Sequence, residues 1–429
     1  MWSRRPDSPG TGPRAGRLTA VLVLLLALPL SGCVGTSASE QERSAPQGEP
    51  LPHGVDVARG LDRLLTQRAE AVRQGRPELL MDRLVERPAF RSQQRTWYAN
   101  LRQLPVQRLG FELQPSSLVR HGQVYTATVT TRLQLRGYDA RPVTTERRFR
   151  FVRRHGRFLL ASVRDPLWER SHDVRLEPWD TERVEIRDTG SVLGVFDDGS
   201  AGRADDVMAS VTRGLGQVST LIPLDWSHRV VVYALSDPGF LDAQPRPSGQ
   251  VDALTFSLDQ APHGQVASTR FVLSPELVSM TGPSRDRLVR HELTHVALGD
   301  RDDQLPTWLS EGLAEWVSVQ ALPPADRTVS KAALVAARRG VDHLPDSDTF
   351  NGPDAAANYG LSWYACEYLV RRGGDALLWQ LVHDLARADD PDARLRRDAG
   401  VSADQLAHRA ATLLVTTYDG PPKGASPKE

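Results

Sequence analysis

The stretch that decides the fold of the C-terminal half is His291-Glu292-Leu293-Thr294-His295. Two histidines four positions apart lie one turn apart on the same face of a helix, so both imidazoles can bind one ion. Zinc takes imidazole nitrogen at about 2.0–2.1 Å, and this spacing meets that geometry without distorting the helix. Glu292 then leans over the open side of the metal, where a general base accepts a proton from zinc-bound water. The motif therefore predicts a catalytic zinc site.

The residues around this motif indicate a helix with definite ends. Ser284 follows Gly282-Pro283 and is expected to cap the N-terminus, and Gly299 is expected just beyond the C-terminus. The stripe expected to face the core consists of Leu288, Val289, Leu293 and Val296.

A catalytic zinc site needs a third protein ligand, and the next segment offers two. After a polar loop at residues 299–304, the chain continues Leu305-Pro306-Thr307-Trp308-Leu309-Ser310-Glu311-Gly312-Leu313-Ala314-Glu315-Trp316. Pro306 stands where helices begin. Glu311 and Glu315 are four positions apart and therefore share one helix face.

These two helices resemble the gluzincin peptidases, in which the third zinc ligand is a Glu on the helix after H-E-x-x-H. The pattern P-x-W-L-x-E-G-x-A-E is especially similar to the bacterial peptidase-MA-like group. The resemblance implies that Glu311 is the third ligand and that Glu315 accepts a hydrogen bond from a ligating imidazole. Fifteen residues separate His295 from Glu311, fewer than in thermolysin-like members, and those members have Asp at the position of Glu315. These departures argue against any well-studied subfamily.

Two further features belong to this expected site. Zinc peptidases need a donor for the oxyanion, and Asn358-Tyr359-Gly360 opens a later helix that resembles the one bringing a tyrosine to the metal in related families. Tyr359 is the first candidate and Tyr364 the second. We also expect Ser268–Leu273 to be an edge strand that lines the cleft and pairs with extended substrate.

The C-terminal domain is expected to span residues 176–418, with a mixed sheet followed by a helical half. The sheet and its helix are predicted at Val184–Ile186, Val192–Phe196, Ala204–Leu221, Arg229–Leu235, and a hairpin of Asp252–Leu258 with Ser268–Leu273. Beyond Ser284 the pattern is mainly helical. The fold class is therefore α+β, with a zincin-like second domain.

The N-terminal domain is expected to span residues 56–172. Helical periodicity over Val55–Leu84 is followed by strand-like alternation over Val124–Leu135, Val143–Val152 and Phe158–Val163. A helical start followed by a curved antiparallel sheet resembles the cone-shaped nuclear-transport-factor-two-like domains. Binding or spacing is the role this resemblance favours.

The distribution of charged residues separates the same two parts of the chain. Residues 56–170 carry 23 Arg or Lys against 11 Asp or Glu, whereas residues 171–429 carry 25 against 38. This asymmetry favours either attraction between the two domains or docking of the basic domain to an anionic envelope partner. Only three of the 53 basic residues are Lys, which points to a general compositional bias. Arg richness is therefore no sign of nucleic-acid binding, and no nucleic-acid partner is expected.

The N-terminus has the order of a bacterial lipoprotein signal. Basic residues precede the apolar run Leu18 to Leu30, which is too short to span a bilayer comfortably, and residues 1–33 are expected to be a signal peptide. Leu30-Ser31-Gly32-Cys33 resembles the lipobox, which implies that Cys33 is diacylated. Residues 34–55 are expected to form a flexible linker and residues 419–429 a disordered tail. Cys366 lies in an apolar helical pattern and is expected to be a buried, inert thiol.

Together these features predict a zinc-dependent peptidase, lipid-anchored at the extracytoplasmic face of a bacterial cell membrane and acting on a peptide or protein. His291, His295 and Glu311 are the expected Zn²⁺ ligands, Glu292 the base and Tyr359 the oxyanion donor. Two alternatives stay open: a catalytically idle zincin scaffold that serves as a cell-envelope binding module, and a structural lipoprotein stabilised by its metal.

Overall fold

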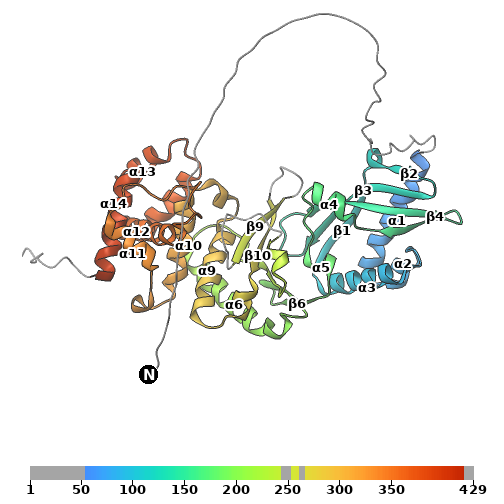
Figure 1. Ribbon diagram of the computed structural model, residues 1–429, viewed down its shortest axis with the longest axis horizontal. Helices are drawn as coiled ribbons and strands as arrows, with labels where there is room; N and C mark the ends of the chain where they lie inside the picture. The colour runs from blue at the N-terminus through green and yellow to red at the C-terminus, as the bar shows by residue number, and fades with distance from the viewer. Residues whose placement is uncertain (1–53, 243–252, 260–265, 420–429) are drawn as a thin grey trace, which may run out of the picture. The chain divides into compact units, whose positions relative to one another are not determined.

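The computed structural model of the chain describes residues 54–242, 253–259 and 266–419 (Figure 1). The described residues belong to one compact unit. The predicted signal peptide, Cys33, residues 34–53 of the predicted linker and the predicted tail from residue 420 lie outside the described residues. Within the described ranges, no helix is both long and apolar enough to cross a membrane.

The first part of the described chain is a curled antiparallel sheet with helices against it (Figure 1). Its helices are α1 (Gly54–Arg73), α2 (Pro77–Met81) and α3 (Pro88–Gln103). Its strands are β1 (Val106–Leu113), β2 (Val119–His121), β3 (Val124–Leu135), β4 (Val143–Arg154) and β5 (Arg157–Ser162). They are ordered β1-β3-β4-β5, and β2 pairs with β3.

The pattern of the sequence explains this sheet. Along β4, Phe149 and Phe151 are buried while Arg150 between them is exposed, as expected for a strand with one face on the core. The predicted helix over Val55–Leu84 is in fact two helices. Gly75 separates them with a φ of +71°, a value that glycine adopts without strain.

The second sheet is mixed, with the order β6-β7-β8-β10-β9. The three central strands run parallel, and the two outer strands run antiparallel to their neighbours. The strands are β6 (Val184–Asp188), β7 (Val192–Asp197), β8 (Val230–Ala234), β9 (Ala253–Asp259) and β10 (Val266–Leu273). Short helices α4 (Pro166–Ser171) and α5 (Pro178–Thr181) lead into this sheet, and α6 (Ala204–Leu221), α7 (Pro238–Asp242) and α8 (Pro275–Ser279) lie between or after its strands.

The prediction that Ser268–Leu273 forms the edge of this sheet is wrong. That segment lies in β10, which pairs with β8 on one side and with β9 on the other. The hairpin partner β9 covers the side of β10 that the prediction left open, so β9 is the edge strand.

Both faces of the second sheet are buried, which is why β7 and β8 are continuous apolar runs. One face packs on α6 and the C-terminal helices. The other face, together with Trp179 of α5 and Leu235 after β8, completes the core of the first sheet through Val184, Leu193, Val195, Val231, Tyr233 and Val272. A buried ion pair between Arg270 on β10 and Asp139 in the first part, 2.9 Å apart, joins the two sheets.

The remainder of the chain is helical (Figure 1). Its helices are α9 (Pro283–Leu298), α10 (Thr307–Gln320), α11 (Lys331–Arg339), α12 (Ala355–Leu385, kinked at Gly374), α13 (Pro391–Ala399) and α14 (Ala403–Asp419). The single-turn 3₁₀ segments are η1 (Pro115–Ser117), η2 (Ala201–Arg203) and η4 (Pro324–Asp326), and the longer η3 (Gly299–Gln304) joins α9 to α10.

The fold class is thus mixed α and β, with a curled antiparallel sheet and a helical part. The boundary between residues 172 and 176 stays a prediction, since each half has its own sheet while the second sheet contributes to both cores.

Candidate metal centre

Two consecutive helices hold the candidate site. α9 carries the two histidines, and its N-cap is Gly282, with a φ of +80°, followed by Pro283 at the first helical position. The prediction of Ser284 as the cap is therefore wrong, because the helix already begins at Pro283 and Ser284 lies inside its first turn. Gly299 ends the helix with a φ of +56°, as expected. η3 then reverses the chain into α10.

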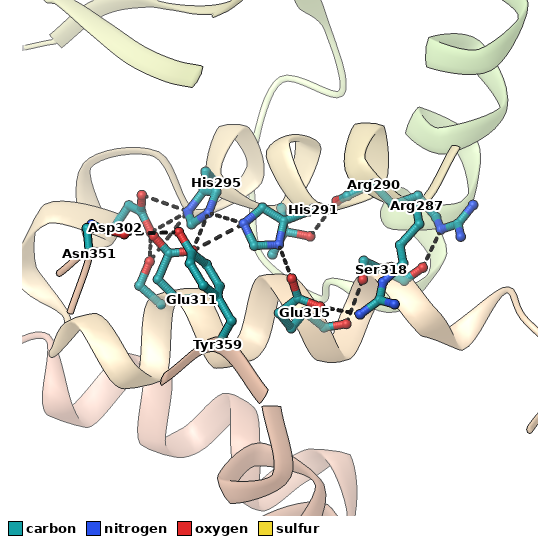
Figure 2. Close-up of polar contacts among 12 residues, drawn as sticks. Arg287, Arg290, His291, His295, Asp302, Glu311, Glu315, Ser318, Asn351 and Tyr359 are labelled. Atoms are coloured by element: carbon teal, nitrogen blue, oxygen red, sulfur yellow. Dashed lines mark hydrogen bonds and ion pairs between the residues drawn. The ribbon is translucent and has the colours of Figure 1, made fainter. Parts of the chain in front are cut away.

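The ligand atoms predicted from the sequence converge (Figure 2). The Nε2 atoms of His291 and His295 are 3.3 Å apart. Oε2 of Glu311 lies 3.2 Å from the first and 3.5 Å from the second. A tetrahedral ion with bonds of about 2.0–2.1 Å keeps its ligand atoms about 3.3 Å apart. The three atoms therefore form the face of a tetrahedron of the size that zinc requires.

Each imidazole is held from behind by a carboxylate. Oε1 of Glu315 lies 3.3 Å from Nδ1 of His291, and Oδ2 of Asp302 lies 3.0 Å from Nδ1 of His295. A proton on Nδ1 leaves the lone pair on Nε2, the atom that faces the cluster. The hydrogen bond from Asp302 thus orients His295 in the way that a metal ligand needs. At His291 the contact with Glu315 lies within ion-pair distance, and Nδ1 has no hydrogen-bond partner among the described residues.

Asp302 is a residue that the sequence analysis missed. It lies in η3, within the loop treated only as a polar connection, and Ser310 of α10 donates its hydroxyl proton to the same carboxylate. The signal was the row of acidic residues in Asp300-Arg301-Asp302-Asp303, but nothing in the spacing shows which of them turns back to α9.

Glu315 is itself anchored. Nη2 of Arg287 donates to its Oε2 at 2.6 Å, and Nη1 of the same guanidinium donates to the backbone oxygen of Thr328 at 3.1 Å. Arg287 stands on α9 one turn before His291, so the two helices are tied together beside the site (Figure 2). The His291 imidazole, and next this guanidinium, lower the pKa of Glu315 in spite of its burial.

The carboxylates dominate the electrostatics of the cluster. Burial alone would lower the pKa of His291, but Glu311 and Glu315 raise it to about 9. Burial is outweighed in the same way at His295, whose pKa Asp302 and Glu311 raise well above its usual value. The cluster therefore attracts positive charge, and a dication would replace the two protons that the carboxylates favour.

A third helix closes over the ligands because Gly312 lets it approach. A Cβ at this position would lie 2.4 Å from the backbone oxygen of Ser362, so α10 and α12 pack with backbone almost in contact. This brings Tyr359, near the start of α12, to a ring-centroid distance of 6.0 Å from His291. Its hydroxyl lies 3.3 Å from Oδ1 of Asn351.

Tyr359 and Glu292 lie within electrostatic reach of each other. Burial, followed by the charges of Glu311 and Glu292, raises the pKa of Tyr359 far above its usual value, so its phenol keeps its proton. Glu292 is 9 % exposed and lies on α9 between the two histidines. Tyr364, the second candidate, is buried against Trp363 and Tyr418 and does not join the cluster.

The donor set suits zinc. Two imidazole nitrogens and one carboxylate oxygen are ligands that zinc prefers, and three protein ligands leave one position of the tetrahedron for water or substrate. Among the described residues, these three side chains form the group that could hold a metal ion. Cys366 is fully buried in α12, and burial raises the pKa of its thiol far above the usual range, as expected for an inert cysteine.

The chain matches no known protein family, and no curated protein is detectably similar to it in sequence.

Proposed function

We propose that this chain is a zinc-dependent peptidase that hydrolyses peptide bonds by metal-assisted attack of water. The observation that carries the proposal is the triangle of Nε2, Nε2 and Oε2 atoms with edges of 3.2–3.5 Å, together with a carboxylate behind each imidazole. The proposal includes a gluzincin-like second half, a cone-shaped first half, and a lipid anchor at Cys33 on the extracytoplasmic face of a bacterial membrane.

The residues of the site would have different roles in the reaction. His291, His295 and Glu311 would hold the ion, and when bound it would supply Lewis-acid polarisation of water and of the scissile carbonyl. Glu292 neighbours the first ligand and would take the proton of the attacking water, then pass it to the leaving amine.

Tyr359 would stabilise the negative charge that develops on the carbonyl oxygen. Its phenol stays protonated beside two carboxylates, so it remains a donor over the whole working range of pH. The close packing of α10 on α12 at Gly312 determines where Tyr359 lies. α12 can reach the ligands only because Gly312 has no Cβ to hold the two backbones apart.

Metal analysis combined with a peptide-library cleavage assay tests this function. Purified protein should bind one Zn²⁺ per chain, and cleavage should disappear with a chelator and return with added zinc. Zinc binding without cleavage of any library peptide would instead support the binding-module alternative. Failure to bind zinc would contradict the peptidase function.

A further inference from the structure

A cavity away from the candidate metal centre lies at the junction of the two sheets. Its wall includes one face of β1, β3 and β4, the helices α3 and α5, and Arg270 of β10. It is partly open and has a volume of about 30 Å³, on a scale where one water needs about 10–15 Å³. A group of two or three heavy atoms therefore fits.

Two polar atoms in its wall have no partner in the fold. Arg147 on β4 is 7 % exposed; one terminal nitrogen donates to Asp180, whereas Nε has no hydrogen-bond partner among the described residues. The buried hydroxyl of Thr131 on β3 is also without a partner there. Thr131 pairs directly with Thr145, two residues before Arg147, so both side chains project from the same face of the sheet. Buried donors without partners are rare and costly, which points to a ligand that accepts from both.

A second buried guanidinium lies beside this wall. Arg68 of α1 is 5 % exposed and stacks 4.1 Å above the ring of Trp97, which also lines the cavity. It donates to the neutral amide of Gln94, and its Nε and Nη1 have no partner within the described ranges. Burial, and next the charge of Arg147, lower the pKa of Arg68 to about 9.

Three carboxylates also line the cavity, and each already has a partner in the fold. Asp180 pairs with Arg147 and accepts from the indole of Trp97, and Asp139 pairs with Arg270. Glu177 accepts from the hydroxyl of Tyr233. None of these acids forms an ion pair with Arg68, although the charge of Asp180 acts on it. A bound anion would add a negative charge near this guanidinium.

We propose that this cavity binds the carboxylate group of a small organic acid. One carboxylate oxygen accepts from Nε of Arg147 and the other from the hydroxyl of Thr131, while the ligand's charge offsets that of Arg68. Only the carboxylate group fits inside the cavity, so the apolar part of the acid extends through the open side. This site is independent of the metal centre.

The test uses the full chain and sodium butyrate, with acetamide and sodium chloride at matched concentration and ionic strength. Butyrate should raise the melting temperature in a saturable way, with little effect from acetamide or chloride. An equal response to chloride would show a simple anion effect, and no response to butyrate would show that the cavity holds only water. Either outcome overturns the proposal.

Two variants locate the effect. Thr131→Val removes a hydroxyl that makes no bond in the fold, so the protein should fold normally while butyrate binding weakens about 10-fold or more. Arg147→Lys keeps a cation beside Asp180 but removes Nε–H, and should weaken binding similarly. Thr144 lies on β4 with Arg147 but faces the other side of the sheet. Thr144→Val should therefore bind butyrate as the unmodified chain does. Unchanged binding in both Thr131→Val and Arg147→Lys would place the ligand elsewhere.

Discussion

Asp302 lies 3.0 Å from Nδ1 of His295, seven residues earlier in the chain, and holds that imidazole with its Nε2 toward Glu311. η3 makes this contact by turning directly back on the end of α9. The loop between the two metal helices therefore shapes the site as well as connecting its parts.

Replacing Asp302 should weaken metal binding without removing a ligand. Asp302→Asn keeps the shape of the side chain but loses the charge that orients His295, so zinc affinity should fall about 10–100-fold. Competition with a chelator of known affinity measures the change. Asp300→Asn, an exposed residue of the same 3₁₀ segment, is the matched control. Equal zinc affinity in both variants would show that Asp302 does not support the ligand.

Replacing Glu311 should affect zinc binding differently from replacing Glu315. Glu311→Ala removes one of three ligand atoms and should abolish stoichiometric zinc binding, whereas Glu315→Ala leaves the ligands in place and should weaken zinc about 10–100-fold. Metal content after dialysis distinguishes the two. Full zinc occupancy in Glu311→Ala with none in Glu315→Ala would reverse the assignment.

Replacing Glu292 should lower the rate of peptide cleavage without changing zinc binding or stability. Glu292→Gln keeps the volume of the side chain but removes its basicity, so cleavage of any peptide substrate should fall about 100-fold or more. Zinc content and melting temperature, measured on the same preparation, should stay close to those of the unmodified chain. A variant that holds zinc and cleaves at the original rate would rule out Glu292 as the base.

Gly312 should be intolerant of a methyl group. Gly312→Ala would place a Cβ 2.4 Å from the backbone oxygen of Ser362, an atom that can move only if a helix moves. The cost should be about 1–3 kcal/mol of unfolding free energy, and Tyr359 should shift away from the ligands. Denaturant unfolding and peptide cleavage measure the two effects.

The control for this variant is another helical glycine. Gly216→Ala in α6 meets no atom within 4 Å and should be stabilising by up to about 1 kcal/mol. If both variants changed stability by the same amount, close packing of α10 on α12 would not explain Gly312.

The sequence was most informative where side-chain periodicity reports burial directly. The strand predicted at Val124–Leu135 has the bounds of β3, and the helix predicted at Ala204–Leu221 has the bounds of α6. The positions of His291 and His295 on one helix also followed from local spacing, whereas the choice of Glu311 over Glu315 on the next helix came from the family resemblance.

What local patterns could not give was long-range pairing. α3 was missed because it is polar overall: its buried residues include Gln94 and Asn100, whose polar side chains are usually found at the surface. β1, which follows α3, was missed as well. The edge strand was misplaced because only the register of β9 against β10 shows which of them is outermost. Asp302 escaped notice because its role depends on how the chain turns after α9.

The core shared by the two sheets also determines the order in which the chain can mature. Residues from Leu61 to Val163 leave the ribosome first, yet their core is completed by Tyr233 and Val272, which are made much later. Nascent chains shorter than about 270 residues must therefore expose apolar surface of the first sheet. Secretion in an unfolded state, before folding begins, would spare the chain this long-lived intermediate.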